Sequence, residues 1–174
     1  MAALLKTRIA TVATLVVLVI GCGKGDVDGQ HAAVSPESLP RVTLERVGDA
    51  SAQVVEGGDC SLDTVNGQPI AAVTLKAGDD ALFVGWVGDP QGGVPSDARL
   101  ILTGDGGMYA APVRTGRDRP DVVEALGKPG LAQSGFGVAT TLAVEPGTYR
   151  VAIAMDSSDA MQCQFDVSLT LAAQ

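Results

Sequence analysis

The stretch MQCQFDVSLTL, residues 161–171, alternates strictly between apolar and polar residues. Met, Cys, Phe, Val and Leu occupy the odd positions, and Gln, Asp, Ser and Thr occupy the even ones. A period of two places the odd side chains on one face of an extended chain and the even ones on the other. The stretch is therefore predicted to be a half-buried β-strand, with Cys163 on the face that meets a hydrophobic core and the polar face in solvent.

Further apolar segments precede this strand, and clusters of Gly, Pro, Asn and Asp separate them. Such clusters favour turns, and short strands at this spacing are typical of an antiparallel sandwich. The sequence therefore predicts an all-β domain over residues 41–174, with one short helix at 119–127, where Pro120 suits the first turn and Gly127 the end. The other predicted strands are 42–44, 52–55, 72–75, 81–87, 98–102, 108–113, 136–144 and 148–155.

Two short motifs add a resemblance to known sandwiches. Pro146-Gly147 followed by Tyr149 resembles the tyrosine corner of immunoglobulin-like and fibronectin-like domains, in which Tyr packs inward and its hydroxyl binds a crossing loop. The pattern of residues 119–136 together with this corner is similar to small β-sandwich domains of bacterial envelope proteins, including sugar-handling membrane proteins. The resemblance implies an immunoglobulin-like β-sandwich and carries over no catalytic residue.

The amino-terminal residues have the pattern of an export signal. Lys6 and Arg8 precede an apolar run at 9–20. As a helix, this run would span only ~18 Å of a bilayer core of about 30 Å, which disfavours a stable transmembrane helix. The sequence VIGC at 19–22 resembles the lipobox of bacterial lipoproteins. This resemblance implies cleavage of a signal peptide at 1–21 and acylation of Cys22; an ordinary cleaved signal with a chance cysteine is the alternative.

Residues 22–40 are predicted to form a flexible tether, because Gly, Ser and Pro dominate and large apolar residues are nearly absent. In the lipoprotein family, Asp after the acylated cysteine favours retention in the inner membrane. Gly23 therefore implies an outer-membrane location facing the periplasm.

Three cysteines are an odd number for an exported chain. If Cys22 carries lipid, Cys60 and Cys163 remain, and an oxidising compartment favours a disulfide between them. Two separate buried thiols are the alternative. No Cys-x-x-Cys spacing occurs and the single histidine, His31, lies in the tether, so no metal site or cofactor is expected.

The charge of the chain excludes one class of partner. It carries 20 acidic and 12 basic residues, and loss of Lys6 and Arg8 with the signal would leave 20 and 10. A net charge near −10 disfavours nucleic acid, whose recognition requires a basic surface.

Few residues suggest a ligand site. Trp86, the sole tryptophan, either stacks on a sugar ring or fills the core. Arg114, Arg117 and Arg119 form the one basic cluster of the domain. They either bind a carboxylate or phosphate of a ligand or pair with nearby acidic residues.

No catalytic constellation is evident in the sequence, so an enzyme is not expected. We expect a lipid-anchored protein of the bacterial cell envelope that acts as a binding or accessory module for an envelope glycan or protein. A structural spacer and, less favoured, a carboxylate-based hydrolase are the alternatives.

Overall fold

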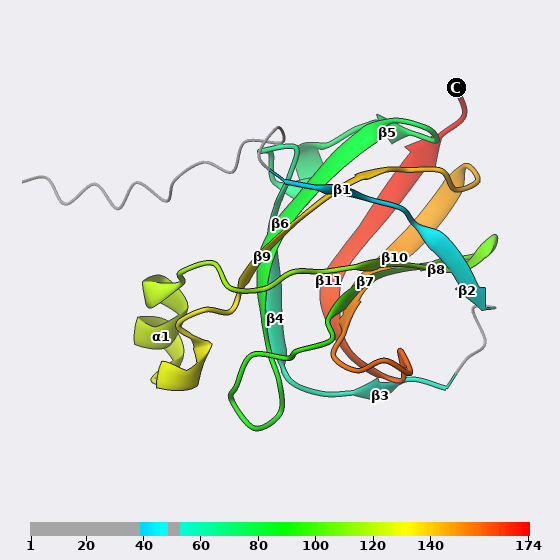
Figure 1. Ribbon diagram of the computed structural model, residues 1–174. Helices are drawn as coiled ribbons and strands as arrows, with labels where there is room; N and C mark the ends of the chain where they lie inside the picture. The colour runs from blue at the N-terminus through cyan, green and yellow to red at the C-terminus, as the bar shows by residue number, and fades with distance from the viewer. Residues whose placement is uncertain (1–38, 49–52) are drawn as a thin grey trace, which may run out of the picture. The chain divides into compact units, whose positions relative to one another are not determined.

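Two β-sheets enclose the hydrophobic core in the computed structural model of the chain (Figure 1). The structure describes residues 39–48 and 53–174, which belong to one unit. The predicted signal peptide, Cys22 and the predicted tether as far as residue 38 lie outside the described residues.

Sheet A has four strands in the order β1-β9-β6-β4. Their bounds are Arg41–Val42 for β1, Gly135–Thr141 for β9, Asp80–Gly88 for β6 and Asp59–Val65 for β4. Strands β4, β6 and β9 are antiparallel, and β1 adds to β9 in parallel. Along β6, Phe83 and Val87 are buried in the core, whereas Val84 and Trp86 are half-buried on the outer face, away from it.

Sheet B has seven strands, six of them in the order β2-β8-β7-β10-β11-β3, with β5 paired to β11. Neighbours from β2 to β11 are antiparallel, while β3 and β5 run parallel to β11. The sheet curls into a half-barrel. The bounds are Glu45–Gly48 for β2, Gly107–Pro112 for β8, Arg99–Gly104 for β7, Gly147–Ala154 for β10, Met161–Ala172 for β11, Val55–Glu56 for β3 and Leu75–Lys76 for β5.

The helical segments are short. Helix α1 spans Pro120–Leu126 and begins with proline as predicted; Gly127, with φ of 64°, ends it in the left-handed region that glycine adopts without strain. Two 3₁₀ turns are η2 (Ile70–Ala72) and η3 (Pro129–Leu131).

The β11 strand confirms the prediction from residues 161–171. Phe165, Leu169 and Leu171 are almost fully buried in the core between the sheets. Tyr149 on β10 is also buried, and its hydroxyl donates a hydrogen bond of 2.7 Å to the Glu145 carbonyl. This is the contact expected of a tyrosine corner.

The two cysteines of the described region connect the sheets. The structure joins Cys60 of β4 to Cys163 of β11 in a disulfide, with Cα atoms 6.1 Å apart. The cross-link therefore ties sheet A to sheet B through one strand of each.

Several sequence-based expectations need correction. Strand β4 was not predicted, because its Asp59 and Asp63 dilute the apolar signal between two turns; a register shift after Leu62 further breaks the alternation. The strand predicted at 72–75 is instead η2 followed by β5. The mostly-β class with two sheets is confirmed, but three strand pairings at the sheet edges are parallel and sheet B curls, so the predicted antiparallel sandwich is confirmed only in part.

Candidate functional site

The predicted residues Trp86, Arg117 and Arg119 come together on the outer face of sheet A. Gly135 of β9 lies directly opposite Trp86, and its backbone exchanges two hydrogen bonds of 3.1 Å with that of Arg117. A Cβ atom on Gly135 would lie 3.0 Å from both Arg117 Cβ and Arg119 Cγ. Glycine at this position therefore leaves room for Arg117 and for the Arg119 side chain next to β9.

Arg119 in this group is engaged in pairing within the protein. Its guanidinium binds the Asp121 carboxylate, with N–O distances of 2.8–3.2 Å, and the Asp63 carboxylate at 2.8 Å. Burial alone would lower the pKa of Arg119, but these two carboxylates outweigh it and raise the pKa. Pairing with Asp121 was one of the two roles considered for the cluster, whereas Asp63, on the unpredicted strand β4, could not be foreseen. Arg119 therefore fastens the α1 segment to sheet A.

Arg114 and Trp86 line neither the groove described below nor the hollow between residues 90–92 and 127–130. Arg114 is exposed and makes no hydrogen bond or ion pair with any residue of 39–48 or 53–174. Trp86 does not belong to the core cluster, so the core-filling role considered for it is not what the structure shows. It is half-buried on the outer face of sheet A.

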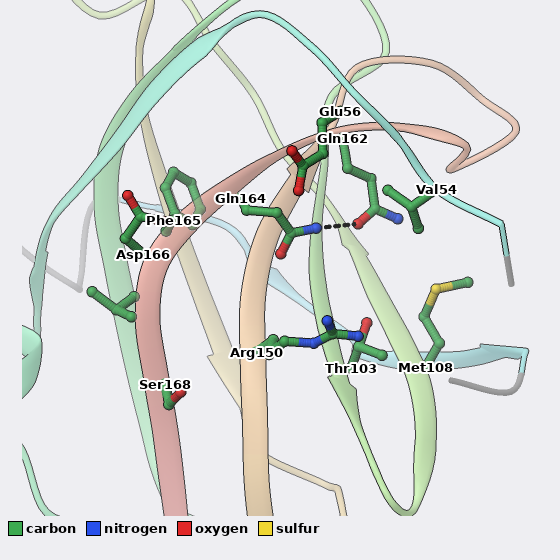
Figure 2. Close-up of a pocket in the computed structure, with 11 residues that line it drawn as sticks. Val54, Glu56, Thr103, Met108, Arg150, Gln162, Gln164, Phe165, Asp166 and Ser168 are labelled. Atoms are coloured by element: carbon green, nitrogen blue, oxygen red, sulfur yellow. Dashed lines mark hydrogen bonds between the residues drawn. The ribbon is translucent and has the colours of Figure 1, made fainter. Parts of the chain in front are cut away.

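A hollow lies instead on the outer face of sheet B, which faces away from the core. It has a volume of about 680 Å³ and is called here the sheet B groove. Figure 2 shows side chains from five strands, β3, β7, β8, β10 and β11, around the same space. They include Glu56, Thr103, Met108, Arg150, Gln164 and Asp166.

The curl of sheet B explains why this face can hold a groove. A second cluster of buried apolar residues lies apart from the main core, and its members alternate with the core residues along β7, β8 and β10. All of these residues are buried, and Met108 is the member of the cluster that lines the groove. Its members are Ile101, Met108, Ala110, Ala152 and Ala154.

One end of the groove has a fixed hydrogen-bond chain. Gln162, only 1% exposed, donates through Nε2 to the Asp159 carbonyl at 2.7 Å. Gln164 then donates to Gln162 Oε1 at 3.3 Å (Figure 2). Two amide side chains are thereby held in a set orientation at the groove wall. The polar face of β11 was predicted to be in solvent, and for Gln162 this is wrong because the curled sheet encloses it.

Asp159, whose carbonyl accepts the first hydrogen bond of this series, is itself held by an ion pair. Its Oδ2 lies 2.5 Å from Arg99 Nη1 in an ion pair, and its Oδ1 is buried without a hydrogen-bond partner among the residues that the structure describes. Burial raises the pKa of Asp159, although Arg99 acts in the opposite direction. The residue also has a φ of 57°, so the turn before β11 is held in an uncommon conformation.

Three charged side chains line the groove without pairing with one another. Arg150, Glu56 and Asp166 are exposed, and none makes a hydrogen bond or ion pair within residues 39–48 and 53–174. The groove therefore presents one guanidinium and two carboxylates whose bonding capacity is unused, next to the oriented amides.

Within the described region, no group of three His, Cys, Asp or Glu side chains is placed to hold a metal ion. The same region contains no helix long and apolar enough to cross a membrane. Comparisons of the chain with protein-family models, with curated proteins and with solved structures found no match.

Proposed function

We propose that this chain is a lipid-anchored envelope lipoprotein whose folded domain is a non-enzymatic binding module for an envelope glycan. The sheet B groove is the site at which the glycan binds. This moves the ligand site away from Trp86 and the arginine cluster, where Arg119 already has its partners within the protein.

The observation that carries the proposal is the groove itself. Its volume of about 680 Å³ falls inside the range of about 300–1,000 Å³ that small-ligand sites occupy. The main chain of β7 and β10 below it is paired in the sheet ladder, whereas residues 165–167 of β11 have no register partner, so a ligand is recognised mainly through side chains. Amides, hydroxyls and charged groups offer both donors and acceptors, which is what the hydroxyl groups of a sugar require.

The position of the groove favours a glycan over a peptide. Extended peptides are commonly recognised by adding a strand to a sheet edge, where backbone groups are unpaired. The groove lies mainly over the face of the sheet, between Thr103 on β7 and Gln164 on β11, and it reaches a sheet edge only along β11.

The anchor and the location are parts of the same proposal and rest on sequence. The basic residues, the apolar run at 9–20 and the lipobox-like 19–22 support acylation of Cys22 and residence in the cell envelope, at the outer membrane facing the periplasm. An immunoglobulin-like relationship of the two sheets is proposed on the corner formed by Tyr149 and Glu145.

Sedimentation with insoluble peptidoglycan tests the glycan ligand. The full chain, kept in detergent, is expected to be retained saturably, and Gln164→Ala should weaken retention about tenfold because it removes an oriented amide. Arg114→Ala, which changes an exposed side chain outside the groove, is the matched control and should bind like the unaltered chain. Absence of saturable retention on peptidoglycan, or equal retention of both variants, would contradict the proposal.

Metabolic labelling with a fatty-acid analogue tests the anchor. Cys22→Ala should leave the chain unprocessed and without label. Normal processing of this variant would show that the signal is of the ordinary cleaved kind.

A further inference from the structure

We infer that Arg150 makes the sheet B groove selective for a glycan segment that bears a carboxylate. The inference rests on the proposed function and names the ligand class more closely. It predicts that the sugar carboxylate binds the Arg150 guanidinium while neighbouring hydroxyls meet the side chains around it.

The first support is the unused state of this guanidinium. Arg41, Arg99 and Arg119 each bind a carboxylate of the protein. Arg150 binds none within the described residues, although Glu56 and Asp166 line the same groove. In a chain with 20 acidic and 12 basic residues, an arginine that stays unpaired beside two carboxylates keeps its full donor set for a ligand.

The second support is the register of the strands. Ser168 of β11 and Thr103 of β7 lie directly on either side of Arg150 of β10, and Met108 of β8 follows Thr103. The row therefore places a guanidinium between two hydroxyls, with an apolar side chain at its end. Figure 2 shows the Arg150 side chain lying across the groove toward Thr103 and Met108.

The chemistry of the row matches an acidic sugar. The planar guanidinium donates two parallel hydrogen bonds to a carboxylate. The hydroxyls of Thr103 and Ser168 act as donors or acceptors to ring hydroxyls, and Met108 offers an apolar contact to the C–H face of a ring. A phosphate monoester fits less well, because Glu56 and Asp166 repel its second negative charge.

Calorimetry with three defined probes tests the inference on the full chain in detergent. The probes are a galacturonate tetramer, the same tetramer with every carboxylate methyl-esterified, and a neutral glucose tetramer. The acid form should bind at least tenfold more tightly than its ester, and added salt should reduce this difference.

Substitutions then assign the selectivity. Arg150→Gln should reduce affinity for the acid to about that for the ester and change the ester affinity far less, while Arg150→Lys should restore part of the difference. Asp166→Asn should strengthen binding of the acid two- to fivefold, since it removes an opposing charge. Arg114→Gln is the matched control and should change nothing. Arg150 is exposed, so thermal unfolding of its variants should match that of the unaltered chain.

The outcomes separate the inference from the proposed function. Equal affinity of the acid and the ester overturns the inference and leaves glycan binding standing. An equal loss for both probes in Arg150→Gln also overturns it, because the arginine would then act through packing. If none of the three probes binds, the inference is overturned. The proposed function is overturned only if the chain is also not retained by peptidoglycan.

Discussion

Removal of the disulfide should cost this domain a large part of its stability. The perturbation is the double substitution Cys60→Ala and Cys163→Ala, and the reference is the oxidised chain. The two cysteines are 103 residues apart in sequence, so the bond closes most of the described domain into one loop.

The expected loss follows from the loop length. In the chain-entropy model a loop of about 100 residues restricts the unfolded chain by about 4.7 kcal/mol at 25 °C. Both cysteines are only half-buried, so the loss of sulfur packing adds little. We therefore expect a loss of about 3–5 kcal/mol in the free energy of unfolding, against a typical total of about 5–15 kcal/mol.

Urea denaturation monitored by circular dichroism measures this change. The double variant should unfold at lower urea, and its m-value should rise because an unfolded chain without the cross-link exposes more surface. The unaltered chain reduced with dithiothreitol is the matched control and should behave like the variant. A thiol count on the denatured, unreduced protein should find neither Cys60 nor Cys163 free. A loss below about 1 kcal/mol, or an unchanged m-value, would refute the argument that the bond acts on the unfolded chain.

Three further perturbations test other contacts. Tyr149→Phe should destabilise the domain by about 1 kcal/mol in chemical denaturation, because the Glu145 carbonyl loses its donor; an unchanged midpoint would show that the corner contributes nothing. Arg119→Ala should cost about 1–2 kcal/mol, since it removes the ion pairs with Asp63 and Asp121, whereas Arg114→Ala should change thermal stability by less than about 0.5 kcal/mol; equal effects would contradict the structural role. Because the pKa of Asp159 is raised in the folded state, its carboxyl favours folding most at low pH. The stability of the unaltered chain relative to Asp159→Asn should therefore fall as pH rises above 3.8, and a difference that grows with pH would contradict the burial of this group.

The sequence predicted the elements whose burial alternates regularly. Strand β11 was placed almost to the residue because the core accepts every second side chain along it. Helix α1 was found from Pro120 and Gly127, whose backbone preferences mark a start and an end wherever they occur. Such signals are local and survive without knowledge of the tertiary structure.

What the sequence could not predict depends on curvature and on pairing between distant strands. The sequence pattern places Gln162 and Gln164 on a face exposed to solvent. In the structure the curl of sheet B makes that face a wall of the groove. Likewise, the sequence does not distinguish Arg150 from the other arginines, because its position between Thr103 and Ser168 depends on the strand register. The predicted arginine cluster was recognised because its residues are close together in sequence. The sequence did not show that Asp63 and Asp121 pair with Arg119.

The link between Cys60 and Cys163 also has a mechanical meaning. If the chain is held at its amino-terminal end and a ligand is held by β11, part of the tension passes through the sulfur bridge from Cys60 into Cys163, which lies between the groove residues Gln162 and Gln164. The hundred or so residues between the two cysteines are bypassed and cannot extend under that load. The covalent link between the sheets would therefore carry part of a pull on the bound ligand, which would help the domain to keep the shape of the groove.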